Sequence, residues 1–196
     1  MYFTEATSLH ELEKFMKMIP NFRPRGHGVI VLCKEEYESE TVSLSEALAG
    51  IRHSSFQRRL RQYIKESEMD PMDYRNEKHR RKFENTIRKK NKKDYRLMAV
   101  LYLLTADYML WRSVSKFVVG NAICFERIRL YDTDENDYAL FCAAKDLYLG
   151  TRYLSVSDLA DRGLVPPRTF ALICNAMAIR RFGLGVIHFT ERDDKK

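Results

Sequence analysis

The feature that most constrains the fold of this chain is an apolar stretch from Leu97 to Val118. Its apolar and small residues recur at alternating steps of four and three, the spacing of one face of an α-helix, at Leu97, Leu101, Leu104, Tyr108, Trp111, Ser115 and Val118. A second apolar row covers much of the remaining circumference. Because a helix that is apolar nearly all round must be surrounded by other elements, the pattern predicts a central helix over about 95–118. We therefore expect a mainly α-helical bundle.

The same stretch does not predict a membrane span. Its unbroken apolar part, Leu97 to Leu104, is much shorter than the roughly 20 residues that a spanning helix needs. The N-terminal sequence has neither the basic region nor the apolar run of a secretory signal. We expect a cytoplasmic protein, in a bacterium or a phage-infected host.

Shorter amphipathic patterns, ended by proline, glycine or capping residues, predict further helices, at Leu9–Ile19, Leu44–Lys65, Asn76–Lys90, Asn136–Leu149, Val156–Asp161 and Arg168–Phe182. Apolar runs predict strands at 29–33 and 186–189, and residues 121–131 fit either a strand or a short helix. Gly120 and Asn121 are expected to end the central helix. The helix-breaking sequence Met69–Met72 suggests a boundary between an α/β appendage (1–73) and a helical domain (74–190).

Positive charge is concentrated in one segment. Residues 75–96 contain eleven Lys/Arg and three Asp/Glu, a net charge of +8, whereas the other residues contain 23 basic and 24 acidic side chains. Cations along one helix face neutralise phosphates and release counterions. The segment therefore predicts a nucleic-acid or nucleoprotein surface, with a solvated helix face as the alternative.

The residues assigned to this surface are the cations of the basic segment: Arg75, Lys78, Arg80, Arg81, Arg88, Lys89, Lys90, Lys92 and Lys93. Secondary candidates are arginines elsewhere in the predicted helices: Arg52, Arg58, Arg59, Arg61, Arg168, Arg180 and Arg181. A second hypothesis comes from residues 154–182, where a short helix, a glycine and a longer helix resemble a helix-turn-helix regulator. An ordinary helical hairpin is the competing interpretation.

Catalysis is poorly supported by the sequence. The chain lacks the spaced motifs of metalloproteases, serine hydrolases and nucleotide-binding loops, and its histidines are too scattered for a zinc site. We expect no metal and no cofactor, and reduced thiols at Cys33, Cys124, Cys142 and Cys174. Asp107 is expected to hydrogen-bond the backbone amides of a neighbouring loop or to pair with an arginine; a hydrolase using it is the least favoured alternative.

Several core-type motifs also carry a resemblance. They are LYLLTAD at 101–107 with Leu110–Trp111, YAL at 138–140 with AAKDLY at 143–148, Leu159–Ala160 and the run from Asn175 to Gly183. In these motifs the chain from about Asn76 resembles uncharacterised proteins of Firmicutes and their mobile elements, which share a domain of unknown function. The resemblance implies a shared helical fold and supplies no catalytic residues.

These observations lead to one preferred function and two alternatives. The preferred hypothesis is a non-catalytic phage or plasmid accessory protein whose basic segment binds nucleic acid. The first alternative is an anti-defence inhibitor, such as an anti-CRISPR protein, that docks on a host nuclease complex and occupies its nucleic-acid channel. The second is the helix-turn-helix regulator. None of the three requires a small-molecule substrate.

Overall fold

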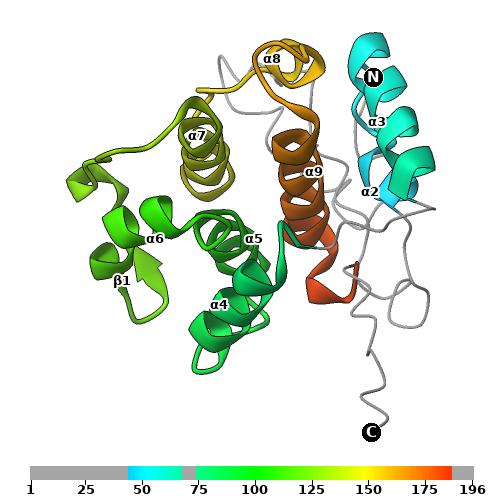
Figure 1. Ribbon diagram of the computed structural model, residues 1–196. Helices are drawn as coiled ribbons and strands as arrows, with labels where there is room; N and C mark the ends of the chain where they lie inside the picture. The colour runs from blue at the N-terminus through cyan, green and yellow to red at the C-terminus, as the bar shows by residue number, and fades with distance from the viewer. Residues whose placement is uncertain (1–43, 68–73, 187–196) are drawn as a thin grey trace, which may run out of the picture. The chain divides into compact units, whose positions relative to one another are not determined.

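The computed structural model describes residues 44–67 and 74–186 (Figure 1). These residues form eight α-helices and one two-stranded antiparallel sheet, which confirms the predicted mainly α-helical class. By its contacts the chain divides into two units, Met1–Glu40 and Thr41–Lys196, and every described residue belongs to the second. The predicted helix at 9–19 and the strand at 29–33 lie outside the described residues.

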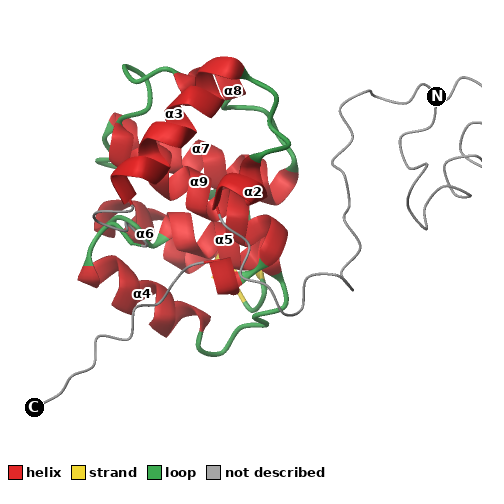
Figure 2. Ribbon diagram, turned by 90° about the vertical axis from the view of Figure 1, so that its right-hand side faces the viewer, coloured by secondary structure: helices red, strands yellow, loops and turns green. Residues whose placement is uncertain are grey.

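Helix α5 (Tyr95–Leu104) is the centre of the second unit (Figure 2). Every residue from Leu97 to Leu104 is buried. The helix packs against α9 (Pro167–Phe182), α7 (Glu135–Leu149) and α4 (Glu77–Ile87). The apolar circumference read from the sequence thus corresponds to a helix covered on several sides, as expected for a bundle core.

The predicted central helix is, however, interrupted at residues 105–107. Helix α6 (Tyr108–Val114) starts anew after the break, followed by the 3₁₀ turn η2 (Ser115–Phe117). Asp107 adopts an extended conformation (φ −128°, ψ 148°) and accepts hydrogen bonds from the amides of Met109 (2.7 Å) and Leu110 (3.2 Å). An aspartate in this position satisfies amides that have no partner within the new helix, so the break is stabilised although the apolar periodicity continues through it.

The predicted helix end at Gly120–Asn121 is also corrected. These two residues form the turn of a hairpin between β1 (Val118–Val119) and β2 (Ala122–Ile123). Gly120 has φ 55°, the left-handed conformation that a two-residue hairpin turn requires and that glycine adopts without strain. The 3₁₀ turn η3 (Phe125–Arg127) follows, so the segment predicted as strand or short helix contains a little of each.

The predicted helix at 44–65 consists of two helices, α2 (Leu44–Leu48) and α3 (Ser54–Ser67). Gln57 stabilises the turn between them, because its side-chain amide donates to the carbonyls of Leu48 (3.0 Å) and Ile51 (2.9 Å). Helix α2 packs on α9, and α3 packs on α8 (Val156–Ala160). Both helices contribute to the same hydrophobic core as the helices after residue 74. All of these helices belong to the unit Thr41–Lys196.

The three C-terminal helices begin and end close to the predicted positions. Asp134 caps α7, which ends at Gly150 in the left-handed conformation (φ 73°). A capping box between Ser155 and Asp158 starts α8. Pro167 occupies the first turn of α9, which leads into the 3₁₀ turn η4 (Leu184–Val186) where the last strand was expected to begin. Within the described ranges, no helix has the length and apolar character needed to cross a membrane.

Candidate nucleic-acid interface

The basic segment is divided by the structure into helix α4 and the loop that joins it to α5. Asn76 caps α4 by accepting from the His79 amide. Phe83 and Ile87 are buried, as their spacing predicted, and His79 extends this narrow buried line by one turn. The remaining faces of α4 are available to its charged side chains.

The arginines of α4 are paired with acidic residues of the same helix. Arg80 donates to Glu77 at 2.8 Å and lies 3.7 Å from Glu84, and Arg81 reaches Glu77 at 2.9 Å. Hydrogen bonds from Arg80 and Arg81 lower the pKa of Glu77 to about 2. Such pairs at helical spacing reduce the charge that the helix presents to a partner. Lys78 and Lys82 are exposed on the same helix.

The loop after α4 differs because, among the described residues, its cations form no ion pair. Five of the six residues from Arg88 to Lys93 are basic. Arg88, Lys89, Lys92 and Lys93 are exposed, and within the described residues none of them is paired with a carboxylate. The loop is nevertheless ordered by hydrogen bonds from the amides of Lys90 to Ile87 (3.0 Å) and of Asp94 to Asn91 (3.0 Å). It therefore presents a dense positive charge from a defined backbone.

The hairpin turn holds the middle of this loop. The Lys90 ammonium donates to the Gly120 carbonyl, and the Asn91 amide donates to the Asn121 side chain at 3.5 Å. Three cations that the sequence did not assign to the interface are also exposed: Lys82 on α4, Lys116 in η2 before the hairpin and Arg96 at the start of α5. Lys116 lies outside the basic segment of the sequence, and its segment leads into the hairpin whose turn contacts the loop.

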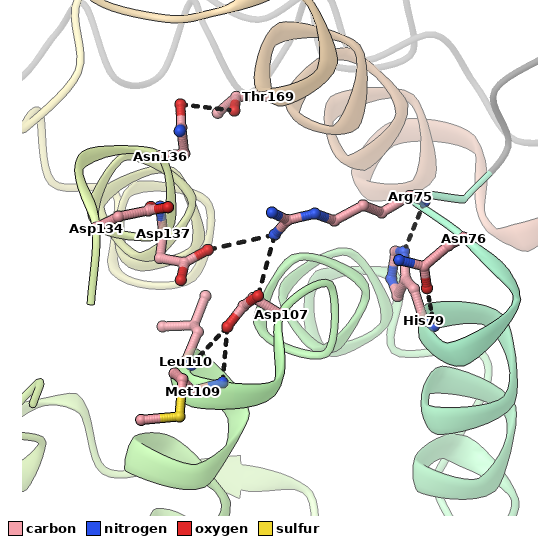
Figure 3. A network of polar contacts seen from close by, with 10 residues as sticks. All are labelled: Arg75, Asn76, His79, Asp107, Met109, Leu110, Asp134, Asn136, Asp137 and Thr169. Carbon is pink, nitrogen blue, oxygen red and sulfur yellow. Dashed lines mark hydrogen bonds and ion pairs between the residues drawn. The ribbon is translucent and has the colours of Figure 1, made fainter. Parts of the chain in front are cut away.

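Arg75 was assigned to the interface but points into the protein (Figure 3). Its guanidinium lies 3.3 Å from a carboxylate oxygen of Asp107 and 3.4 Å from one of Asp137. The expected pairing of Asp107 with an arginine is thus confirmed, whereas the amides that it accepts from belong to helix α6 and not to a neighbouring loop. Arg75 joins the start of α4 to the starts of α6 and α7, and its charge is used within the fold.

The Arg75 network includes two groups with shifted pKa values. Burial, together with the charge of Asp107, raises the pKa of Asp137 to about 6 despite the opposing effect of Arg75. Burial lowers the pKa of His79 to about 4. His79 Nδ1 accepts from the Arg75 amide (3.1 Å) and Nε2 lies 2.8 Å from the Tyr102 carbonyl oxygen. These contacts select the neutral tautomer with a proton on Nε2.

The two carboxylates of the Arg75 network are used within the fold. Asp137 is buried and Asp107 is committed to the cap of α6 as well as to Arg75. Within residues 44–67 and 74–186, no group of three or more histidine, cysteine or acidic side chains is placed to hold a metal ion. The guanidinium of Arg75 connects the N-terminal ends of α4, α6 and α7.

Arg59 also departs from its predicted role. It is 6% exposed, and its guanidinium donates to the carbonyls of Leu159 (2.6 Å), Asp161 (3.0 Å) and Val165. It lies 4.2 Å above the Phe170 ring centroid. These hydrogen bonds connect α3 to α8 and to the loop that follows it, so the Arg59 guanidinium is unavailable to a partner.

The other secondary candidates occupy varied positions. Arg181 is half-buried and donates to the Ala47 carbonyl at 3.0 Å, while Arg180 is exposed and reaches the Leu147 carbonyl at 3.4 Å. Four remain exposed on the surface, Arg52, Arg58, Arg61 and Arg168. Arg58 and Arg61 line a shallow hollow with Ser54 and Ser55. Among the described residues, Arg180 and Arg181 bond to carbonyls of α7 and α2 rather than to the basic loop.

Helix α9 does not have the exposure of a recognition helix. Nine of its residues are buried, from Thr169 to Ile179, and it packs on α5, α7 and α2. A recognition helix must present its side chains to base edges in the major groove. Helix α9 is accordingly a core helix, while α8 packs against α3.

The cysteines agree with the expectation of free thiols where they are described. Cys142 and Cys174 are buried, Cys124 is half-buried, and all three are free. Burial raises the pKa of the Cys174 thiol. Cys33 lies outside the described residues.

Comparisons with models of protein families, with curated proteins and with solved structures find no match to this chain. The resemblance to proteins of Firmicutes and their mobile elements stays a prediction.

Proposed function

We propose that the protein is a non-catalytic nucleic-acid-binding protein whose main contact surface is the loop Arg88–Lys93. The observation that supports this proposal is the density of exposed cations in that loop, Arg88, Lys89, Lys92 and Lys93, none of which is paired with a carboxylate within the described residues. Phosphate groups spaced along a nucleic-acid backbone are the polyanion that such a loop neutralises best, with release of condensed counterions. The assignment to a phage or plasmid accessory rests on the resemblance of the residues from Asn76 onward.

The hairpin strengthens the proposal because it fixes the loop before a ligand arrives. Lys90 and Asn91 are held by the turn at Gly120 and Asn121. A surface that is ordered in the free protein loses less conformational entropy on binding. The expected binding is strongly salt-dependent and shows little sequence preference, because phosphate contacts carry no base information.

The test compares two variants with the same change in charge. The loop variant replaces Arg88, Lys89, Lys92 and Lys93 by glutamine, and the helix variant replaces Lys78, Arg80, Arg81 and Lys82 by glutamine. Fluorescence anisotropy with labelled DNA and RNA over a salt series gives the affinity and its salt slope. If each loop cation contacts a phosphate, the loop variant lowers the slope for duplex DNA by roughly 3 to 4.

The helix variant serves as the matched control. It should retain more of the affinity, because Arg80 and Arg81 are already paired with Glu77. Equal losses in both variants would show that net charge, and not this loop, controls binding. Absence of binding by the unmodified protein at low salt would overturn the proposal, and capture of a protein target would then test the anti-defence inhibitor.

A further inference from the structure

Two tyrosines, Tyr138 on helix α7 and Tyr153 in the turn after it, expose large aromatic rings. Tyr138 is 56% exposed and Tyr153 is 54% exposed. Exposed aromatic rings provide apolar area together with a flat π surface. The two rings are not part of the hydrophobic core of the described helices, which is formed by other residues.

Lys145 connects the two tyrosines into one surface. It lies two helical turns after Tyr138 on the same face of α7, roughly 10 Å along the axis. Its ammonium donates to the Tyr153 hydroxyl at 2.9 Å and lies 4.4 Å from the centre of that ring. The pKa of Tyr138 is raised, first by its hydrogen bond with Cys142; the charge of Tyr153 also raises it, and that of Lys145 lowers it. Tyr138 therefore lies on the face of α7 that also carries the Lys145–Tyr153 pair.

The segment carrying Tyr153 is fixed although the ring is exposed. Asp146 accepts hydrogen bonds from the Thr151 hydroxyl (2.7 Å) and from the amides of Tyr153 (3.0 Å) and Leu154 (2.9 Å). One carboxylate thus holds the whole turn after α7. The ring of Tyr153 is presented from a constrained backbone, as a preorganised binding surface requires.

The tyrosine surface is linked to the basic loop through the hairpin. Arg96 lies 4.7 Å above the Tyr148 ring of α7, and the Ile123 amide of β2 donates to the Tyr148 hydroxyl at 3.2 Å. The turn of the same hairpin holds Lys90. These contacts connect the basic loop to α7 through the hairpin, so the loop and the helix that carries Tyr138 and Lys145 belong to one packed arrangement.

We propose that Tyr138 and Tyr153 are stacking sites for unpaired bases, and that the ligand of this protein is single-stranded nucleic acid. The inference rests on the proposed function of the basic loop and specifies its substrate class. Aromatic rings interleaved with cations bind single strands because every base offers a π face while the cations follow the backbone. In a duplex the faces of the bases are stacked on one another, so the rings would contribute little.

The test uses a labelled single-stranded oligonucleotide and the duplex formed from the same sequence. The stacking variant combines Tyr138→Leu with Tyr153→Leu, and its control combines Tyr138→Phe with Tyr153→Phe. Leucine keeps apolar area without a π face, whereas phenylalanine keeps the ring and removes only the hydroxyl. We expect the leucine variant to lose at least tenfold in single-strand affinity and less than about threefold in duplex affinity, with single-strand binding retained by the phenylalanine variant.

The outcomes separate this inference from the function on which it rests. Unchanged single-strand affinity in the leucine variant, or an equal loss for single strand and duplex, overturns the stacking inference. If the loop variant still loses affinity in that case, the proposed function stands without it. Thermal denaturation of each variant verifies that the protein is folded at the assay temperature.

Discussion

Arg59 and Arg75 have the same charge as the cations of the loop Arg88–Lys93, but they face in the opposite direction. Arg59 meets three backbone carbonyls, and Arg75 meets two carboxylates. The loop cations meet no acidic side chain among the described residues. The difference shows that the acceptors which the fold brings within reach decide whether a cation serves the core or a partner. A count of basic residues along the sequence does not show which of them face the core and which face a partner.

The largest expected effect on folding follows from replacing the inward-facing Arg59. Arg59→Met leaves three carbonyls without their charged donor and should lower the free energy of unfolding by about 2–4 kcal/mol. The matched control is Arg58→Met, on the same helix and exposed, which should change stability by less than about 0.5 kcal/mol. Urea unfolding followed by circular dichroism measures both. Similar losses of stability in Arg59→Met and Arg58→Met would contradict the distinction between inward-facing and outward-facing arginines.

His79 makes the inward-facing network sensitive to acid. Its pKa is about 4 in the folded protein and near 6.5 in an unfolded chain. The unfolded state therefore binds the proton first as the pH falls. The stability that His79 contributes is complete above pH 6.5 and is lost toward pH 4, by up to about 3 kcal/mol.

The His79 effect is isolated by comparing the protein with His79→Gln across pH 7.5 to 4.5. The stability advantage of the unmodified protein should shrink as the pH falls, because the glutamine does not titrate. An advantage that stays constant over this range would refute the assignment of a buried neutral histidine.

Asp137 should show a smaller effect of the opposite sign. Its folded pKa of about 6 lies above the unfolded value near 3.9, so the stability it contributes is present below the unfolded pKa and is lost as the pH rises through 6. Asp137→Asn keeps an oxygen for Arg75 and removes the repulsion from Asp107. We expect the variant to be more stable by roughly 1–2 kcal/mol at pH 7.5, and by less at pH 5. A destabilised variant at pH 7.5 would show that the ion pair outweighs burial.

The smallest effect on folding is expected from the outward-facing loop. Replacing Arg88, Lys89, Lys92 and Lys93 by glutamine should change the free energy of unfolding by less than about 0.5 kcal/mol. The same variant should have the largest effect on nucleic-acid affinity. Thermal unfolding and the binding assay, carried out on the same variant, check both statements. A loss of stability comparable to that of Arg59→Met would show that the loop cations stabilise the fold.

Local sequence patterns predicted much of the fold. The periodicity around Leu97–Leu104 indicated the buried helix, and the capping residues near Asp134 and Pro167 placed the starts of α7 and α9 within a residue or two. Phe83 and Ile87 correctly gave the buried line of α4. In each case the information lies within a few neighbouring residues, which is the range over which helical spacing and capping act.

Features that depend on distant partners were not visible in the sequence. The break at Asp107 interrupts a periodicity that continues on both sides, and the aspartate is further held by Arg75, 32 residues earlier. Arg59 is buried by carbonyls about 100 residues away. The pairing of Lys90 with Gly120 likewise requires the hairpin to be in place. The basic segment was therefore found, but which of its cations face outward was not.

The anchoring of the basic loop to the hairpin has a consequence for how the protein responds to ions. Folding holds five like charges within six residues on an ordered backbone, whereas the unfolded chain can extend and separate them. Dissolved salt screens this self-repulsion in the folded protein, but it also competes with the loop for phosphate. A higher ionic strength should thus stabilise the folded loop and, at the same time, weaken its binding to a polyanion.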